Sequence, residues 1–353
     1  MEELALQVSK IIRCYRKDDI DEFFYNTEMT PKHVINWVNQ FDENDREFLL
    51  SELLHILPES YFSKDFMRKF LDLALTKISK DLGYENLYDF LLEAQVIQCQ
   101  GQRKSQTEII ILLNEIFKDK FGKSIKDFPL NNVKYWIYID DLLASGGTFK
   151  RNIIEEIKHH ALDGGFRNSN VEIVCLFIGS HSLGQEKTLY SIDKTLNWEV
   201  SKRIRIYRYL NLENDLRKNE PKLNFVYPKE NEEGLHFLSF IDKAFVRNYP
   251  MRNERIAFRP SNLPVKEDFY SSSKARDRYE SILLKKGIEL IYNIENITVE
   301  SIRPLGMTNP SNKTLGTGSH FFTWRNISNT CPIVFWWEAN GWYPLFPVKN
   351  RGV

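Results

Sequence analysis

The chain has 353 residues, of which 42% are hydrophobic and 27% charged, and its 48 Lys and Arg balance its 48 Asp and Glu. This is the composition of a folded globular protein, and it excludes the disordered, collagenous and fibrous classes. The length predicts two domains or one elaborated domain. A net charge of zero excludes a protein coated in positive charge, while local basic patches remain compatible with it.

The sequence has no pattern typical of a disulfide framework, a zinc site or membrane insertion. Its four cysteines lie far apart and form no CxxC or Cys/His spacing. The first residues, MEELALQVSK, include early acidic residues and do not resemble a signal peptide. No segment approaches the roughly 18 consecutive apolar residues of a membrane span. We therefore expect a soluble, cytoplasmic protein with no membrane partner.

Residues 1–92 carry the periodicity of amphipathic helices. Apolar residues recur at spacings of three and four along this stretch. Thr30 and Pro31 form an N-cap followed by a proline in the first helical turn, and Gly83 suits the end of a later helix. We predict a helical N-terminal domain over residues 1–92.

Residues 93–230 alternate apolar runs with helical segments. The predicted strands are AQVIQCQ (94–100), VKYWIYID (133–140), VEIVCLFIG (171–179) and RIRIYRYL (203–210). Near-continuous apolar runs separated by helices are typical of a parallel sheet that is covered on both faces. The sequence therefore predicts an α/β core over residues 93–230.

Residues 231–353 predict a C-terminal extension of helices and a β-hairpin. The helical segments are GLHFLSFIDKAFVRNY and KARDRYESILLKKGIELI. The segment PIVFWWEANGWYPLF places two aromatic runs around Asn340 and Gly341, the residue pair favoured in type I′ hairpin turns. We expect a Trp-rich hairpin that follows the helices.

The segment YWIYIDDLLASGGTF (135–149) carries the clearest chemical pattern. A predicted strand ends in Asp140 and Asp141, and a run of small residues then opens a helix. Small residues let the main chain approach a phosphate closely, and the N-terminus of a helix favours an anion. The two carboxylates can accept hydrogen bonds from a ribose diol or reach a Mg²⁺ ion. The candidate phosphate-binding residues are Ala144, Ser145, Gly146, Gly147 and Thr148.

This segment resembles the phosphoribosyl pyrophosphate (PRPP) loop of type I phosphoribosyltransferases. The family pattern is an apolar strand, two acidic residues, two apolar residues, a small residue, then Ser/Thr/Gly, Gly, Gly and Thr. The resemblance implies a type I phosphoribosyltransferase-like sheet. It also implies that Asp140 and Asp141 are the catalytic carboxylates, contact the ribose hydroxyls and are candidate Mg²⁺ ligands, and that residues 144–148 bind the 5-phosphate. A tight turn without a ligand is the structural alternative.

A basic loop, QGQRKS (100–105), follows the first predicted strand of the sheet. Type I phosphoribosyltransferases carry a pyrophosphate loop at this place, which makes Gly101, Arg103, Lys104 and Ser105 candidates for that role. The loop is richer in polar side chains than the family's usual one. Its GxxKS pattern also resembles a fragment of a nucleotide-binding P-loop with the first glycine missing. A solvated basic loop without a ligand is the third interpretation.

The ending LGTGSHFFTWRNISNTCPIVFWWEANGWYPLFP resembles the tail of a phosphoribosyltransferase-like effector family of bacterial antiphage conflict systems. That family includes members associated with retrons, and the likeness extends from about residue 30 to the end. It implies protein partners in a defence complex. Type I phosphoribosyltransferases normally have a hood, a segment that covers PRPP and supplies the acceptor site. No segment of this sequence matches a known purine or pyrimidine hood.

Several other features have a functional and a structural interpretation. The cluster Gly316–Ser319 and His320 suit either a ligand contact or a turn. His181 follows the third strand as a candidate acceptor contact or a plain loop residue. The aromatic tail suits base stacking or a core; its tryptophans are Trp324, Trp336, Trp337 and Trp342. Two basic clusters suit a nucleic-acid surface or a salt-bridged face; they contain Lys202, Arg203, Arg205, Arg208, Arg247, Arg252, Arg255 and Arg259.

Together these patterns predict a phosphoribosyltransferase-like effector of antiphage defence. It would bind PRPP or a related ribose phosphate or nucleotide with Mg²⁺, and transfer or cleave at the ribose C1 carbon. Two alternatives remain at this stage. One is a non-catalytic subunit that senses PRPP or a nucleotide, and the other is a subunit that docks on nucleic acid, for example with a retron reverse transcriptase and its DNA.

Overall fold

The computed structural model divides into two compact units. The sheet unit comprises Asp65–Leu212, and the terminal unit comprises Met1–Lys64 together with Glu213–Val353. The residues that the structure describes are 1–17, 28–102, 104–130, 132–159, 165–244, 257–295, 297–338 and 341–348.

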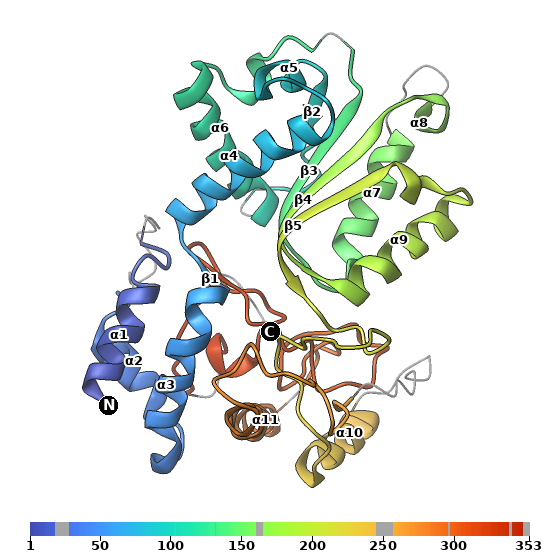
Figure 1. Ribbon diagram of the computed structural model, residues 1–353. Helices are drawn as coiled ribbons and strands as arrows, with labels where there is room; N and C mark the ends of the chain where they lie inside the picture. The colour runs from blue at the N-terminus through green and yellow to red at the C-terminus, as the bar shows by residue number, and fades with distance from the viewer. Residues whose placement is uncertain are drawn as a thin grey trace. The chain divides into compact units, whose positions relative to one another are not determined.

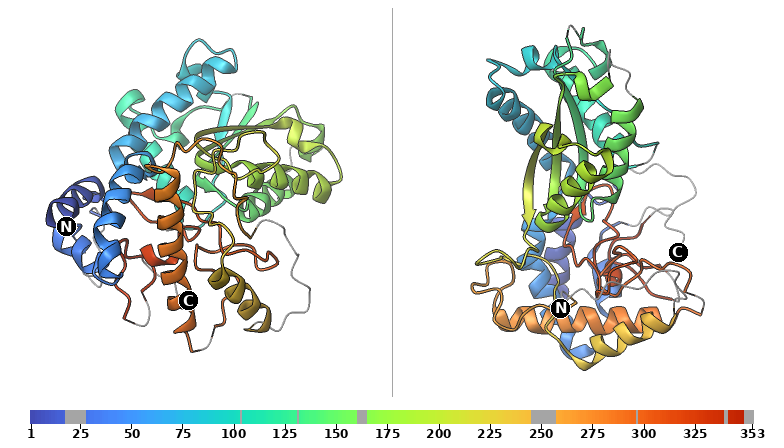
Figure 2. Two further views of the ribbon diagram at one scale, coloured as in Figure 1. Left: turned by 60° about the horizontal axis from the view of Figure 1, so that its bottom comes forward. Right: turned by 90° about the vertical axis from the view of Figure 1, so that its right-hand side faces the viewer.

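The sheet unit is built on a four-stranded parallel sheet in the order β2-β3-β4-β5 (Figure 1). Helices connect successive strands and lie on both sides of the sheet (Figure 2, right). The strands are β2 (Ala94–Val96), β3 (Tyr135–Leu143), β4 (Glu172–His181) and β5 (Ile204–Leu212). The helices are α4 (Lys64–Asp81), α5 (Leu87–Leu91), α6 (Ser105–Phe121), α7 (Gly147–His159), α8 (Gly165–Asn168) and α9 (Ser182–Leu196), with 3-10 turns η1 (Ile125–Asp127) and η2 (Val200–Arg203).

Both faces of the sheet are buried, as the near-continuous apolar strands predict. In β3, Trp136 and Tyr138 face a core that also contains Phe149 of α7 and Ile192 of α9. Ile137, which points to the opposite face between them, is fully buried as well. The α/β fold class with a parallel sheet and flanking helices is therefore confirmed.

The first strand of the sheet is shorter than the predicted run 94–100. It ends at Val96, and the chain then leaves the strand to form the basic loop. The amides of Cys99 and Gln100 donate to the side-chain oxygen of Gln106, at 2.7 and 3.0 Å. These amides are bound by the first turn of α6, so they are not available to extend the strand ladder.

The terminal unit joins the two ends of the chain. β1 and β6 pair in parallel, with Tyr61 opposite Phe322. The helices of this unit are α1 (Glu2–Ile12), α2 (Pro31–Val38), α3 (Glu43–Ser60), α10 (Glu232–Ala244) and α11 (Ser273–Tyr292). Its short elements are β1 (Tyr61–Phe62), β6 (Phe322–Thr323) and the 3-10 turn η3 (Ile333–Phe335). None of the helices that the structure describes combines the length and apolarity needed to cross a membrane.

The aromatic tail packs against the N-terminal helices. Trp37 of α2 donates its indole N–H to the Val334 carbonyl at 2.9 Å, and its ring stacks on Phe335. Tyr15 donates its hydroxyl to the Pro347 carbonyl at 2.8 Å. This packing explains why the first 64 residues group with the last 141 instead of with the sheet.

The two units therefore differ from the expected division at residues 92 and 230. α4 and α5 fall within the predicted N-terminal helical domain, yet both belong to the sheet unit. Arg68 of α4 illustrates the reason, because it pairs with Glu115 and Asp119 of α6 at 2.9 and 2.6 Å.

The predicted β-hairpin in PIVFWWEANGWYPLF is wrong. In the described part of this segment, η3 forms a 3-10 turn and no strand is present. Asn340 lies outside the described residues. Pro332 and Pro344 lack the N–H that a strand ladder requires. The aromatic side chains of the tail pack against the N-terminal helices instead of against a second strand of a hairpin.

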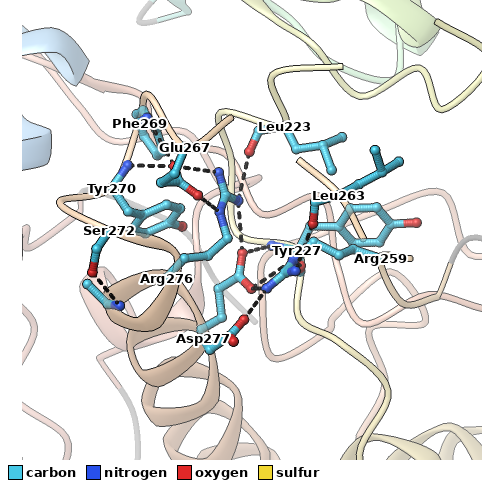
Figure 3. Close-up of polar contacts among 12 residues, drawn as sticks. Leu223, Tyr227, Arg259, Leu263, Glu267, Phe269, Tyr270, Ser272, Arg276 and Asp277 are labelled. Carbon is cyan, nitrogen blue, oxygen red and sulfur yellow. Dashed lines mark hydrogen bonds and ion pairs between the residues drawn. The ribbon is translucent and has the colours of Figure 1, made fainter. Parts of the chain in front are cut away.

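A cluster of buried charged side chains anchors α11 (Figure 3). Glu280 of α11 lies 3.0 Å from Arg259 and 3.2 Å from Arg276. Arg276 also pairs with Glu267, and Arg259 contacts Asp277 at 2.6 Å. The side chains of Glu280, Arg259 and Arg276 are all at most 2% exposed, so each buried charge is balanced by an opposite charge.

The same side chains hold irregular segments against the helix (Figure 3). Arg276 donates to the Leu223 carbonyl at 2.9 Å, and Arg259 donates to the Tyr227 carbonyl at 2.9 Å. Glu280 accepts from the Tyr227 amide at 2.9 Å. Residues 223–227 form no helix or strand, and hydrogen bonds to the buried charged side chains hold their main chain in place.

We expect Glu280→Gln to destabilise the terminal unit by about 3 kcal/mol, because it leaves two buried guanidinium groups without a carboxylate between them. Denaturant unfolding measures this loss. The matched control is Asp268→Asn, which removes an exposed ion pair with Lys266 and should cost less than about 1 kcal/mol. Equal costs for the two variants would contradict this account of the cluster.

Candidate functional site

The candidate site lies at the carboxyl ends of β2 and β3 in the sheet unit. Residues 97–104 connect β2 to α6, and residues 144–146 connect β3 to α7. β2 and β3 are parallel neighbours, with Val96 opposite Ile137, so both loops leave the same edge of the sheet. Ligands of open α/β sheets bind at this edge.

The carboxylate of Asp140 is buried and accepts four hydrogen bonds from the protein. Its Oδ1 accepts from the Ser105 hydroxyl at 2.6 Å and from the Asp141 amide at 2.9 Å. Its Oδ2 accepts from the Gln100 side-chain amide at 2.6 Å and from the Tyr138 hydroxyl at 3.1 Å. Asp140 is only 7% exposed. Its charge is therefore satisfied within the protein.

The hydroxyl of Tyr138 has a defined direction in this network. It accepts from the Asn152 side-chain amide at 3.2 Å and from Gln100 at 3.4 Å. Because these donors occupy its lone pairs, its own proton points to Asp140. Asn152 lies on α7, which begins within residues 144–148; we call these residues the phosphate loop, after their predicted role. The network therefore extends from the basic loop to the helix that begins in the phosphate loop.

Two opposing effects act on the proton affinity of Asp140. Burial, and next the charge of Asp141, raise the pKa of Asp140 to about 7. The hydrogen bonds from Ser105, from the Asp141 amide and from Gln100 act in the opposite direction. Because each of the four acceptor positions of Asp140 receives a hydrogen bond, this arrangement suits the ionised carboxylate.

Asp141 is placed differently from its neighbour. It is half-buried, and its Oδ1 accepts from the Leu142 amide at 2.7 Å. The two consecutive carboxylates that the sequence presents as a pair therefore lie in different environments. One is enclosed by protein donors, and the other reaches the surface of the strand end.

The phosphate loop is shaped by close packing against the start of α9. Gly146 has a φ of +72°, and a Cβ on it would lie 1.7 Å from the Thr188 hydroxyl oxygen. A Cβ on Gly184 would lie 1.8 Å from the Ala144 carbonyl oxygen. Only glycine suits these two positions, because no side-chain carbon fits in the available space.

The opposite side of the phosphate loop is open to solvent. Ser145, Gly147 and Thr148 are exposed. Gly147 begins α7, a helix of 13 residues, so the first amides of that helix lie beside these exposed residues. An exposed helix N-terminus with neighbouring hydroxyls can bind the oxygens of a phosphate group.

The basic loop is folded onto α6. Thr107 donates its hydroxyl to the Gly101 carbonyl at 2.9 Å, and Ser105 is the first residue of the helix. Gly101 and Lys104 are exposed, whereas the Ser105 hydroxyl is used by Asp140. Arg103 lies outside the described residues. The structure thus brings Lys104 and the phosphate loop to one edge of the sheet.

Four residues that shape this site were missed by sequence reasoning. They are Tyr138, Asn152, Gly184 and Thr188. Gln100 and Tyr138 lie within segments already singled out, but nothing in their spacing indicates a hydrogen bond between them. Gly184 and Thr188 follow the next strand, and only the pairing of β3 with β4 brings them to the phosphate loop.

Two of the other candidate ligand contacts lie in the core. His181 ends β4 and is 1% exposed, and burial lowers its pKa to about 4. His320 and the preceding Ser319 are fully buried in the terminal unit, where His320 contacts the Tyr279 hydroxyl at 2.9 Å. The cluster Gly316–Ser319 is irregular chain at this core, and the Gly318 amide donates to the Leu305 carbonyl at 2.7 Å.

The basic residues of 202–208 have protein partners. Lys202 pairs with Glu199 at 2.5 Å, and Arg205 pairs with Glu172 at 2.6 Å. Arg208 donates to the side chain of Gln185 at 2.9 Å. Arg203 donates to main-chain carbonyls between residues 166 and 169. The interpretation as a salt-bridged and hydrogen-bonded face therefore fits this cluster better than a free basic surface.

The second basic cluster and the tail tryptophans also differ from a nucleic-acid surface. Arg259 is buried in the ion cluster of α11. Arg247, Arg252 and Arg255 lie outside the described residues. Trp336 and Trp337 are buried, and Trp324 and Trp342 are half-buried, so the tryptophans mainly form core.

The residues of the site fit a Mg²⁺ ion that arrives with a phosphate ligand better than one held by the protein alone. Within the described residues, no three His, Cys, Asp or Glu side chains gather in a way that could hold a metal ion. Asp140 has a donor at each acceptor position. Asp141 is a half-buried carboxylate at the same strand end, and Mg²⁺ bound with substrate phosphates needs only one or two protein carboxylates.

Comparison with known proteins relates nearly the whole chain to a family. A family model described as PRTase-CE matches residues 34–348. Neither the curated proteins nor the solved structures contain a match to this chain. The matched range includes the strand–loop–helix segment at 135–149, the basic loop and most of the aromatic tail.

We expect Gly146→Ala to cost about 3 kcal/mol of stability, from the positive φ and from the contact with Thr188 together. Gly83→Ala is the matched control, because Gly83 also has a positive φ but a Cβ there meets nothing within 4 Å. The control should cost about 1 kcal/mol. Thermal unfolding of the sheet unit measures both, and equal losses would show that Thr188 does not restrict the loop.

We expect His320 to make the stability of the terminal unit depend on pH. Burial lowers the pKa of His320 to about 3, so protons bind this side chain in the unfolded state before they bind it in the folded state. The free energy of unfolding should fall by about 1.4 kcal/mol per pH unit as the pH drops below about 6.5.

Denaturant unfolding between pH 7 and pH 4 measures this slope. His320→Gln should make it shallower, whereas His236→Gln, at an exposed position on α10, should leave it unchanged. An unchanged slope in His320→Gln would contradict the assignment.

Proposed function

Because the chain belongs to the PRTase-CE family, we propose that it binds PRPP or a related ribose phosphate or nucleotide with Mg²⁺ and transfers or cleaves at the ribose C1 carbon. The family is phosphoribosyltransferase-like. We place the activity in bacterial antiphage defence, as an effector with protein partners, because residues 315–347 resemble the tail of such effectors.

The observation that carries the proposal is the shape of the phosphate loop. Thr188 closes one side of Gly146, and the other side presents Ser145 and Thr148 at the N-terminus of α7. A turn that only connects a strand to a helix does not need an exposed helix N-terminus flanked by two hydroxyl groups. The same features suit the 5-phosphate of a ribose ligand.

The remaining groups of the site suit the other parts of the ligand. Asp141, near the end of β3, would accept hydrogen bonds from the ribose hydroxyls. Lys104, exposed on the basic loop, would attract the negative pyrophosphate. The two loops leave the same sheet edge, as binding both ends of one ligand requires.

These groups suit a displacement at C1. The bond between C1 and the pyrophosphate oxygen breaks, and its electron pair leaves with the pyrophosphate. A nucleophile, or water in the cleavage reaction, forms a bond to C1 and loses a proton. Lys104 stabilises the negative charge that develops on the leaving group. Mg²⁺, when bound with the ligand, neutralises part of the same charge.

Binding without turnover is the second candidate function. The observation that favours it is the enclosure of Asp140, because one of the two carboxylates is occupied by the protein's own donors. In that case PRPP or nucleotide occupancy would regulate a partner of the defence complex. Pyrophosphate release from PRPP separates the two functions, because only the catalytic one produces it.

We expect the protein to bind PRPP with Mg²⁺ in isothermal calorimetry, and Thr148→Val to weaken that binding about tenfold through the loss of one hydrogen bond to a charged phosphate. Thr195→Val is the matched control, because Thr195 is also an exposed threonine on a helix of the sheet unit but lies far along α9 from its N-terminus. The control should bind PRPP as the parent protein does.

A parent protein that binds neither PRPP nor nucleoside phosphates would contradict the proposed function. Equal weakening by Thr148→Val and Thr195→Val would contradict the phosphate loop as its site. Protection of a bacterial host against phage that survives Asp141→Asn unchanged would separate the defence role from this site.

A further inference from the structure

We propose that Asp140 is a positioning residue, which ties the basic loop to the phosphate loop, and that Asp141 alone faces the ribose. The paired acidic residues of the sequence thus have different tasks. This inference rests on the proposed function for the identity of the ligand, but its structural part concerns the protein without ligand.

The first argument is the occupancy of the Asp140 carboxylate. A carboxylate has about four acceptor positions. All four are used by Ser105, Gln100, Tyr138 and the Asp141 amide, at distances between 2.6 and 3.1 Å. A ribose hydroxyl would have to displace one of these donors and break its hydrogen bond to a charged group, which is unfavourable.

The second argument is where the donors come from. Gln100 belongs to the basic loop, and Ser105 is the first residue of α6. Tyr138 belongs to β3 and receives a hydrogen bond from Asn152 of α7. A single carboxylate therefore links the loop after β2 to the helix that follows the phosphate loop.

The third argument is that the basic loop depends on few other contacts. The amides of Cys99 and Gln100 are held by the Gln106 side chain, and the Gly101 carbonyl accepts from Thr107. These contacts fold the loop onto its own helix. Three sets of hydrogen bonds join the loop to the neighbouring strand β3: those of Gln100 and Ser105 to Asp140, a longer one from Gln100 to the Tyr138 hydroxyl at 3.4 Å, and one at its start from the Ile97 amide to the Ile137 carbonyl at 3.0 Å. The two to Asp140 are the shortest, at 2.6 Å, and set the place of the loop beside the phosphate loop.

The consequence for the reaction is a preformed spacing between two anion-binding loops. A ligand with a phosphate at one end and a pyrophosphate at the other needs both loops in register. Loops that are ordered before binding cost less entropy when the ligand arrives. Asp140 then acts on the pyrophosphate end of the ligand through Ser105 and Gln100, without touching the ligand.

Amide hydrogen exchange of the ligand-free protein tests the structural part. We expect Asp140→Asn and Ser105→Ala to speed exchange in residues 98–102 about tenfold, because each removes hydrogen bonds that hold the loop. Ser105→Thr keeps the hydroxyl and should restore the parent rate. Asp141→Asn should leave these rates as in the parent.

Asp193→Asn is the matched control for Asp140→Asn. Asp193 of α9 also accepts from a serine hydroxyl and a main-chain amide, both of Ser201, at 2.5 and 2.8 Å. Its loss should speed exchange near Ser201 and not in residues 98–102. Parent-like exchange of residues 98–102 in both Asp140→Asn and Ser105→Ala would overturn the proposal.

Calorimetry with inorganic pyrophosphate, without added Mg²⁺, tests the functional part. Pyrophosphate has no ribose, so a residue that only contacts ribose hydroxyls cannot weaken its binding when mutated. We expect Asp140→Asn to weaken pyrophosphate binding about tenfold, by releasing the loop that binds it, and Asp141→Asn not to weaken it. Weakened PRPP binding with unchanged pyrophosphate binding in Asp140→Asn would overturn the proposal in favour of a direct ribose contact.

Failure of the proposed function has a different signature. In that case the unmodified protein binds neither PRPP nor pyrophosphate, whatever the variants do. The exchange rates of residues 98–102 then still decide whether Asp140 holds the basic loop in place.

Discussion

The carboxylate of Asp140 can stay buried in the sheet unit only because four donors surround it. Those donors come from a loop, a helix start and a strand, so the need to satisfy one charge brings three segments together. The parallel pairing of β2 with β3 makes this meeting possible, because it places both strand ends at one edge. The candidate ligand site is built on that edge, between an exposed lysine and an exposed helix N-terminus.

Packing against the next strand completes the site. Thr188 of α9 fills the space in which a side chain on Gly146 would lie, and Gly184 of the same helix leaves room for the Ala144 carbonyl. The loop is thereby closed on its protein side and open on its solvent side. Gly146 is required by this close approach whether or not a ligand binds, so a glycine pair in a sequence does not by itself distinguish a binding loop from a packed turn.

Buried charge has a comparable structural use in the terminal unit. Glu280 with Arg259 and Arg276 holds segments that have little regular structure, and the aromatic tail covers the N-terminal helices. The basic cluster at 202–208 is likewise engaged with acidic partners and carbonyls. Arginines and tryptophans that suit nucleic-acid contacts in the sequence are therefore mostly part of the protein's own framework. The edge of the sheet at which β2 and β3 end remains the main candidate site for chemistry.

The sequence by itself determined the elements whose signal is local. Apolar runs specified β3 and β4 to within three residues at either end, and helical periodicity specified α11, because burial on both faces or on one stripe follows directly from residue type. The DD…SGGT segment likewise identified the loop. Only the tertiary structure decided that Asp140 is enclosed while Asp141 is not, that the tail forms no hairpin, and that the two chain ends share one unit. Each of these depends on contacts between residues distant in sequence, such as Ser105 with Asp140 or Trp37 with Val334, and residue type and spacing carry no information about such contacts.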